Sequence, residues 1–327
     1  MIFVTGAAGF IGSNVVAALN DAGRTDLVLC DRLRQADKWL NLRKRSFADL
    51  VPPEEIDPYL AGSPKLSAVI HMGAVSATTA RDGDEVMERN FRFSLKLLDW
   101  CTARAVPFVY ASSAATYGDG EQGFVDSNDP SQVALLMPLN LYGWSKRAFD
   151  FVVADRARRG KRMPPRWAGF RFFNVFGPNE YHKGDMQSVV AKIFPVASSG
   201  DEVTLFRSHR AGIADGDQRR DFVYVRDVVS VLMWSLGETG RNGIFNLGTG
   251  EARSFRELAE AVFSALGTEP RIRYVDMPES IRDKYQYYTA ASLDHLRQAG
   301  YSAPMTALED AVADYVGSYL AAPDRYR

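Results

Sequence analysis

A tyrosine and a lysine four residues apart, Tyr142 and Lys146, have the residue types and spacing that suit proton transfer. On a helix, positions i and i+4 lie on one face, so the two side chains would be neighbours. An adjacent ammonium favours the phenolate and lowers a phenol pKa that is ordinarily ~10. Such a tyrosine can take a proton from a hydroxyl group while a hydride leaves the same carbon. We therefore predict that Tyr142 and Lys146 are catalytic.

A serine-rich segment before this pair supports the prediction. Residues 108–112 are expected to form a buried strand, and Ser113 follows at its end. Ligands of open parallel sheets bind at the carboxyl ends of the strands, so Ser113 is predicted to hydrogen-bond the reacting oxygen. The Tyr-Lys spacing alone is common, and an exposed helix pair is the alternative interpretation. The serine-rich strand end, and a glycine motif upstream, favour the catalytic one.

That glycine motif is formed by Gly6, Gly9 and Gly12. It follows an apolar run and opens an amphipathic stretch, so the backbone can turn sharply and approach a pyrophosphate at a helix N-terminus. Asp31 ends the next apolar run, 19 positions after Gly12, where a carboxylate can accept hydrogen bonds from an adenosine ribose. The spacing predicts a nicotinamide dinucleotide, and a structural turn without a ligand is the alternative.

The residues around Asp31 bear on which dinucleotide binds. A carboxylate repels a 2′-phosphate, so Asp31 alone favours NAD. Arg32 follows directly and Lys38 is close behind, and a guanidinium can hold the additional phosphate bidentately. We predict NADP, with NAD as the possible alternative. The same cations could also be a solvated loop face.

The elements that must position these residues follow from the pattern of apolar runs. Strands are predicted at 2–5, 26–30, 68–72, 108–112 and 167–173, and helices at 12–22, 84–103 and 141–158. Continuous apolar strands alternating with helices indicate a parallel sheet that is covered on both faces. Two further strands are predicted at 222–225 and 243–247, with Asp227 as the N-cap of a following helix, and helices are expected near 254–266 and 305–320.

The predicted fold class is therefore α/β, a Rossmann doubly wound parallel sheet with a smaller C-terminal substrate-binding lobe. The dinucleotide-binding domain is predicted to span 1–173, with 221–250 contributing late strands, and the substrate lobe to comprise 174–220 and 251–327.

Composition excludes several classes of function. A formal net charge of -1 and a pI near 6.5 provide no global field for nucleic acid or an anionic membrane. The two cysteines, Cys30 and Cys101, lie in apolar stretches and are expected to be buried thiols, and no metal site is expected. No signal peptide or membrane-spanning run is expected, which favours a cytoplasmic location.

The longer first gap of the G-x-x-G-x-x-G motif resembles the extended short-chain dehydrogenase/reductase family. In that family the 4,6-dehydratases carry an Asp-Glu pair just after the catalytic hydroxyl residue, whereas this chain has Ala114 and Ala115. The fucose-synthase branch uses a cysteine that Ala114 also replaces. The resemblance therefore leaves epimerisation through a transient ketone.

Further segments resemble the ADP-L-glycero-D-manno-heptose 6-epimerase family over nearly the whole chain. They are 170–178, 180–186, 205–206, 219–225, 243–250 and 284–286. The H-K-G of 182–184 and the Y-Q of 285–286 are the family-specific parts. The resemblance implies an isomerase that epimerises C6 of an ADP-heptose for lipopolysaccharide inner-core biosynthesis. It also implies tightly held NADP and a homopentamer.

Residue by residue, the resemblance extends the predicted site. The cofactor-binding set is Gly6, Gly9, Phe10, Ile11, Gly12, Asp31, Arg32, Lys38, Met72, Gly73, Ala74, Val75, Ser76, Asn90, Tyr142, Lys146, Val175 and Lys183. The substrate-binding set is Ser113, Asn174, Asp185, Lys192, Phe206, Arg207, Ser208, His209, Arg220 and Tyr285. Three positions depart from the family pattern: Asp185 replaces a small serine, Lys192 a histidine, and Pro53 a lysine that assists NADP.

Lys183 is predicted to be the second acid/base, serving the sugar face that Tyr142 cannot reach. An ammonium is a poor base at its ordinary pKa of ~10.4, so Lys183 must be desolvated or lie beside another cation, with Lys146 and His182 as candidates.

Two other functions remain open. A UDP-hexose 4-epimerase would share the glycine motif, Ser113, Tyr142 and Lys146, but it reuses one base and has no need of Lys183. A non-catalytic NADP-binding sensor need not retain all three catalytic residues. The expected partners are a nucleotide sugar and further copies of the chain.

Overall fold

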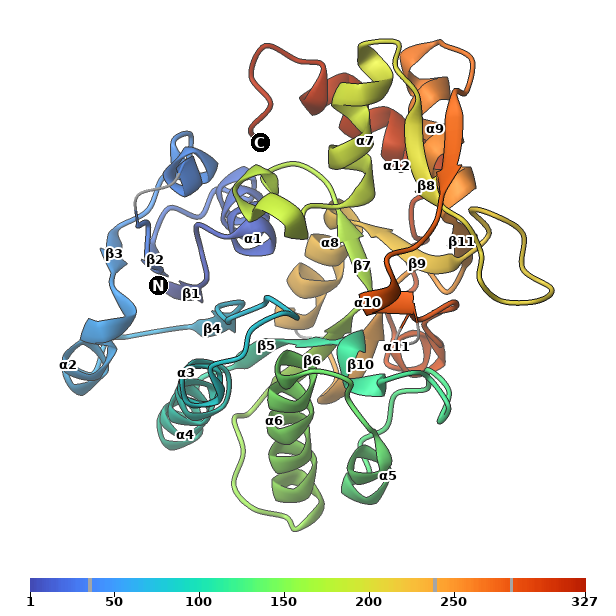
Figure 1. Cartoon of the computed structure of the whole chain (residues 1–327). Helices are drawn as coiled ribbons and strands as arrows, with labels where there is room; N and C mark the ends of the chain where they lie inside the picture. The colour runs from blue at the N-terminus through green and yellow to red at the C-terminus, as the bar shows by residue number, and fades with distance from the viewer. Residues whose placement is uncertain (35–36, 238–239, 283–284) are drawn as a thin grey trace.

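The computed structural model describes residues 1–34, 37–237, 240–282 and 285–327. A seven-stranded sheet lies at its centre in the order β3-β2-β1-β4-β5-β6-β10, and every pairing is parallel (Figure 1). The strands are β1 Ile2–Thr5, β2 Leu27–Cys30, β3 Asp49–Val51, β4 Ala68–His71, β5 Phe108–Ser113, β6 Trp167–Phe172 and β10 Gly243–Leu247. The order reverses between β1 and β4, the switch point where ligands of such sheets bind. This confirms the predicted Rossmann class.

Alternate residues of each central strand face two separate cores. In β1, Ile2 and Val4 pack into one core, and Phe3 packs into the other. Helices α1 Phe10–Asp21 and α8 Val225–Leu236 cover the first face, and α2 Ile56–Ala61, α4 Phe93–Arg104 and α6 Leu141–Arg158 cover the second. Because both faces are covered, most residues of these strands are apolar, which is why all of them except β3 could be predicted.

Two smaller sheets lie beyond the carboxyl edge of the large one. Strands β11 Ala252–Ser254, β9 Arg219–Tyr224 and β7 Asn174–Phe176 form one, and β12 Ile272–Val275 and β8 Val203–Phe206 form the other. They share a third core with α7 Val189–Ser198, α9 Phe255–Leu266 and α12 Leu308–Tyr315. Of residues 221–250, β10 joins the large sheet and β9 the three-stranded one. We propose the same division into a dinucleotide-binding domain and a substrate lobe.

The remaining described elements are short. They are η1 Asp37–Leu42, η2 Pro53–Glu55, α3 Gly83–Val86, η3 Met87–Arg92, η4 Ala114–Tyr117, α5 Pro130–Leu135, η5 Tyr181–Met186, α10 Glu279–Arg282, α11 Asp294–Gln298 and η6 Val316–Leu320. The helix predicted at 84–103 is thus divided into α3, the π-helical η3 and α4, and the edge strand β3 was not predicted.

The N-cap prediction for Asp227 was wrong. Helix α8 begins at Val225, with Tyr224 as its N-cap, so Asp227 lies within the first turn. Its carboxylate instead accepts hydrogen bonds from the backbone N–H of Thr306 at 2.9 Å and from its hydroxyl at 2.8 Å. The carboxylate that was predicted to cap the helix therefore binds Thr306, a residue that is distant in the sequence.

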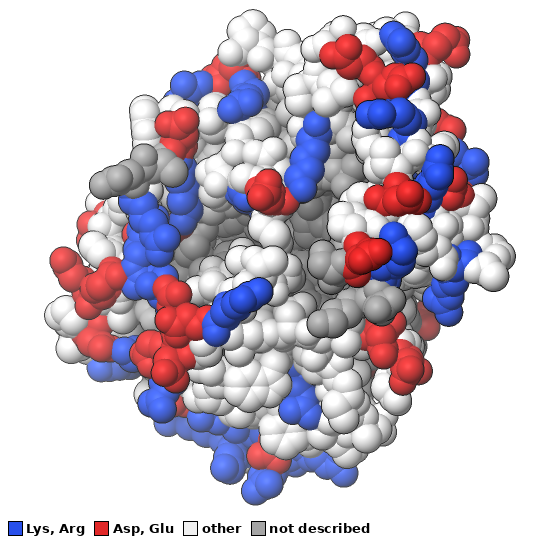
Figure 2. Space-filling view, viewed as in Figure 1, with Lys and Arg blue, Asp and Glu red and all other residues white. Residues whose placement is uncertain are grey.

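Both cysteines are buried and free, as expected. Burial raises the pKa of Cys30 to about 12 and also raises the pKa of Cys101. Lysine, arginine and acidic side chains are interspersed over the face shown in Figure 2, in keeping with the small net charge. Among the described residues, no helix has both the length and the apolar character to span a membrane.

Candidate active site

The glycine motif forms a tight turn between β1 and α1. Gly6 has φ +64°, and a Cβ there would lie 2.6 Å from the backbone nitrogen of Gly73. A Cβ on Gly12 would lie 2.1 Å from the carbonyl oxygen of Gly6. Gly9 is the N-cap of α1 and gives it no side-chain cap, so the first N–H groups of the helix are left for another acceptor. The turn therefore fits a dinucleotide pyrophosphate.

The residues predicted for the adenosine end lie together at the end of β2. The Asp31 carboxylate accepts hydrogen bonds from the backbone N–H of Ala8, in the glycine turn, at 2.8 Å and from that of Arg32 at 2.7 Å. Lys38, on η1, forms an ion pair with Asp31, and Arg32 forms one with Glu54. Both cations of the NADP prediction are thus paired with carboxylates in this structure, Lys38 with Asp31 and Arg32 with Glu54.

Residues 72–76 follow β4 at the carboxyl edge of the sheet, and Asn90 fixes their path. Its side-chain oxygen accepts from the N–H of Val75 at 2.8 Å, and its Nδ2 donates to the carbonyl of Val75 at 3.0 Å. The same Nδ2 donates to the hydroxyl of Ser145 at 3.0 Å. Asn90 therefore joins the predicted cofactor loop to the helix that carries Tyr142.

Tyr142 lies in the first turn of α6, where the side chain of Asn140 caps the helix by accepting from the N–H of Gly143 at 2.8 Å. Burial raises the pKa of Tyr142, and a hydrogen bond with the Ser113 side chain acts to lower it. Ser113 lies at the end of β5. The structure thus brings the predicted serine to the predicted tyrosine.

Lys146 is 3% exposed, and its Nζ donates to the carbonyl oxygen of Ala111 at 2.8 Å. Burial lowers the pKa of Lys146 to about 8, against the opposing effect of Asp150. We expected Lys146 to lower the pKa of Tyr142. In this structure it does not, because its ammonium donates to the carbonyl of β5 instead.

A buried polar network beneath this pair was not predicted as part of the site. The Asp150 carboxylate accepts from Tyr110 at 3.0 Å, Ser112 at 2.8 Å and Arg171 at 2.9 Å. Arg171 also donates to the hydroxyl of Tyr117 at 3.0 Å. Asp150 acts to raise the pKa of both Tyr142 and Lys146. The sequence could have pointed to Asp150, because it lies four residues after Lys146 and therefore on the same face of the helix.

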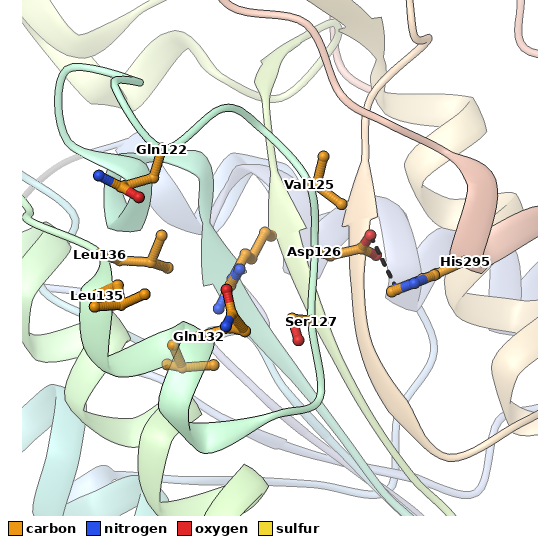
Figure 3. A pocket seen from close by; sticks show the side chains of 10 residues that line it. Gln122, Val125, Asp126, Ser127, Gln132, Leu135, Leu136 and His295 are labelled. Atoms are coloured by element: carbon orange, nitrogen blue, oxygen red, sulfur yellow. Dashed lines mark ion pairs between the residues drawn. The ribbon is translucent and has the colours of Figure 1, made fainter.

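A cavity of about 320 Å³ lies between α5, the loop 122–127 and α11, and Arg171 is among the residues that line it (Figure 3). Leu135 and Leu136 form one wall, and Asp126 and His295 approach each other to 3.2 Å at the other. None of the residues lining it belongs to the predicted site. The chemistry is therefore assigned to the carboxyl edge of the sheet and not to this cavity.

Lys183 lies on η5, with its Nζ 5.1 Å from the centre of the Phe10 ring at the start of α1. Burial lowers the pKa of Lys183; Glu180 opposes this and Lys192 adds to it. Lys183 is half-buried, and this partial desolvation shifts its pKa in the direction that a basic lysine requires. The neighbouring cation that lowers the pKa of Lys183 is Lys192, whereas we expected Lys146 or His182. Lys192 itself donates to the carbonyl of Asp185 at 2.6 Å.

Three of the predicted substrate residues come together from separate elements. The Arg220 guanidinium, on β9, lies 5.2 Å from the ring centre of Tyr285, and that ring meets Phe206, at the end of β8, edge to face at 6.4 Å. Asn174 and Val175 start β7, the neighbour of β9. An aromatic and cationic surface of this kind suits a nucleotide base and its phosphates.

The other predicted substrate residues follow β8. Ser208 donates its backbone N–H to Asp215 at 2.8 Å, and the His209 ring accepts from the N–H of Met277 at 3.1 Å. Arg207 faces Asp215 and Asp276 at 3.9 and 4.0 Å. These contacts fix the loop after β8 beside Phe206.

The glycine turn, the flanked carboxylate and the Ser-Tyr-Lys cluster together define a dinucleotide-dependent enzyme of the short-chain dehydrogenase/reductase type. Residues 2–248 match the model of the NAD dependent epimerase/dehydratase family, and the chain belongs to that family.

Full-length relatives narrow the comparison. The chain is 44% identical to an ADP-L-glycero-D-manno-heptose-6-epimerase of Fusobacterium nucleatum and 48% identical to one of Nitratidesulfovibrio vulgaris, in both cases over 100% of each chain. The solved structure of the Helicobacter pylori enzyme of the same name superposes with a TM-score of 0.80 at 26% identity, covering 97% of this chain and 95% of that one. A Thermus thermophilus UDP-glucose 4-epimerase in complex with NAD superposes with a TM-score of 0.72 at 27% identity, covering 96% and 97%. The predicted membership of the heptose epimerase group is confirmed.

Proposed function

We propose that this protein is an ADP-glyceromanno-heptose 6-epimerase, which interconverts the D-glycero and L-glycero forms of ADP-manno-heptose through a transient C6 ketone. The observation that carries the proposal is the presence of two separate acid/base candidates. Tyr142 is hydrogen-bonded to the side chain of Ser113, at the end of β5. Lys183, half-buried and with a lowered pKa, lies over Phe10 at the start of α1. Full-length relatives of that name support the choice of substrate.

The chemistry of the site follows from the two positions. A bound nicotinamide dinucleotide supplies the acceptor and donor of the hydride. Epimerisation requires the hydride to leave one face of C6 and return to the other, so the C6 oxygen occupies two places. Useful proton transfer needs ~2.6–3.2 Å between heavy atoms, which one fixed group cannot provide for both places. Tyr142, held by Ser113, moves the proton for one epimer, and Lys183 moves it for the other.

The remaining residues orient the ligands. The N-terminus of α1 and the cations Arg32 and Lys38 hold the dinucleotide, and we propose NADP because a 2′-phosphate would meet both cations. Arg220, Tyr285 and Phe206 hold the nucleotide end of the substrate. We further propose a cytoplasmic homo-oligomer, pentameric by resemblance, that serves lipopolysaccharide inner-core biosynthesis.

The direct test supplies the purified protein with ADP-D-glycero-D-manno-heptose and, separately, with UDP-galactose in deuterated water. The expected result is conversion of the ADP-heptose only, without deuterium at C6, because the hydride returns directly. Conversion of UDP-galactose instead would establish the 4-epimerase, and bound cofactor that neither sugar reduces would establish the non-catalytic sensor. Deuterium at C6 would indicate proton abstraction from carbon.

A further inference from the structure

The side chain of Asn41, on η1, is buried between the glycine turn and the loop that carries Lys183. Asn41 is 1% exposed. Its Nδ2 donates to the carbonyl of Ala8, in the glycine turn, at 2.9 Å and to the carbonyl of Asn179, in the Lys183 loop, at 3.0 Å. It also lies 3.2 Å from Nδ1 of His182. One amide nitrogen therefore joins the two parts of the site that the two-base chemistry requires.

The amide orientation of Asn41 is fixed by its partners. Both backbone partners are carbonyl oxygens, which only accept, so the atom between them must be the donating nitrogen. Burial lowers the pKa of His182 to about 4, so its ring is neutral near neutral pH. The two N–H protons of Asn41 serve the two carbonyls, and Nδ1 of His182 makes a polar contact with the same nitrogen. An oxygen at the Nδ2 position would face two carbonyls without a proton to share.

The loop is also held by contacts to α1 and to the last residues of the chain. Asn179 has φ +73°, an unusual conformation for a residue other than glycine, and its side chain donates to Ser13 at 3.0 Å and accepts from the backbone of Arg327 at 3.0 Å. The backbone N–H of Lys183 donates to the carbonyl of Glu180 at 3.1 Å. The Nδ2 of Asn14 also donates to the carbonyls of Phe10 and Pro178, both at 2.9 Å, and so holds the start of the loop against α1. Asn41 adds a contact that reaches both the carbonyl of Ala8 and His182, the neighbour of Lys183.

Asn41 also shares η1 with Lys38, whose ammonium pairs with Asp31 at the adenosine end. The short helix thus contacts the predicted cofactor site at one end and the Lys183 loop at the other. We propose that Asn41 is a positioning residue for Lys183, which sets the second base at its working distance from the nicotinamide dinucleotide site. The inference rests on the proposed function, because it assigns Lys183 to one of the two half-reactions.

The experiment compares Asn41→Ala and Asn41→Asp with the wild type. In each protein we would measure epimerisation of ADP-heptose, cofactor reduction from the epimer assigned to Tyr142, and dinucleotide released on denaturation. Asn41→Ala is expected to slow epimerisation by about 10²-fold, the effect of a misplacement of ~1 Å. It should leave dinucleotide content and the Tyr142 half-reaction close to wild type. Asn41→Asp has nearly the same shape but lacks the two N–H donors, so its epimerisation rate should fall by as much or more.

A matched control is Asn20→Ala. Nδ2 of Asn20 also donates to two backbone carbonyls, of Arg24 at 2.8 Å and of Ser46 at 2.9 Å, but it lies outside the site. Its epimerisation rate should stay at the wild-type value. If Asn41→Ala does not fold, Asn41→Ser, which keeps a hydroxyl donor, is judged by the same half-reaction criterion.

A second readout does not depend on turnover. A carboxylate at position 41 beside the His182 ring would stabilise the imidazolium, so Asn41→Asp should raise the pKa of His182 seen by NMR. Wild-type epimerisation in Asn41→Ala, an equal loss of both half-reactions, or an unchanged His182 titration in Asn41→Asp would each overturn the inference. A wild-type protein that does not epimerise ADP-heptose would instead refute the proposed function, and the two failures are distinguishable.

Discussion

The Arg171 guanidinium donates to the Asp150 carboxylate at 2.9 Å beneath the catalytic helix, with side-chain exposures of 1% and 0%. A buried ion pair of this kind costs desolvation of both groups, so its effect on stability is revealed when one partner is removed. Because Asp150 also acts on the pKa of Tyr142 and Lys146, the pair connects the stability of the fold to the electrostatics of the site.

Arg171→Met should destabilise the protein by about 3–5 kcal/mol, because it leaves the Asp150 charge buried without its partner. Chemical denaturation measures the free energy of unfolding. The matched control is Arg159→Ala, which removes an exposed pair with Asp155 at 2.8 Å near the end of the same helix and should cost less than about 1 kcal/mol. Equal losses in the two variants would contradict the importance of burial.

Tyr142→Phe should reduce turnover by ~10²–10⁴-fold while the dinucleotide stays bound, because the phenol moves the proton and the glycine turn lies elsewhere. Turnover and released dinucleotide are measured on the same preparation. Tyr301→Phe, which removes a hydroxyl that donates to Ser230 at 3.0 Å, serves as the control. Near-normal turnover in Tyr142→Phe would remove this residue from the mechanism.

Lys183→Met should abolish epimerisation yet permit the half-reaction of the epimer that Tyr142 serves. Its Nζ lies over Phe10, and methionine keeps the packing without the basic group. Cofactor reduction, or dismutation of an aldehyde analogue, follows each half-reaction separately. Lys96→Met, which removes a surface pair with Asp57, is the control. Epimerisation at the wild-type rate in Lys183→Met would favour the single-base 4-epimerase.

Arg32→Ala should weaken binding of NADP by about 10- to 100-fold and leave NAD nearly unchanged, since only NADP offers a phosphate to the guanidinium. Titration of the apoprotein with each dinucleotide gives the two affinities. Arg24→Ala, in the exposed pair with Asp26, provides the comparison. Mostly NAD in the denatured wild-type protein would reverse the assignment of the cofactor.

The rate should fall as pH rises through about 8, because burial lowers the pKa of Lys146 to that value. The ammonium donates to the carbonyl of Ala111 in this structure, and its positive charge would still stabilise a phenolate that forms on Tyr142 during turnover. The pKa of Tyr142 is raised, so its own ionisation lies above this range. The pH profile of kcat/KM measures the effect. Lys146→Arg keeps the charge at all pH values and should move the basic limb upward. A profile that stays flat to pH ~10 would show that the charge of Lys146 does not matter.

The sequence by itself determined the local parts of this protein. The strands of the large sheet other than β3 could be predicted because most of their residues are apolar and buried on both faces, and β1 and β10 match their predicted bounds. Helix α6 could be predicted because its apolar positions and the Tyr142–Lys146 spacing share one helical period. The glycine turn could be recognised because the tight backbone conformation that requires glycine is set by residues close together in the sequence.

Only the tertiary structure decided the contacts between distant segments. The Asp150–Arg171 pair crosses from a helix to a strand, and Asn41 meets Asn179 across 138 positions. Phe206, Arg220 and Tyr285 come from separate elements. A sequence pattern records which face of an element is buried, not what covers it. The covering residues follow from strand order and crossover connections, which bring distant polar groups together only when the chain is folded.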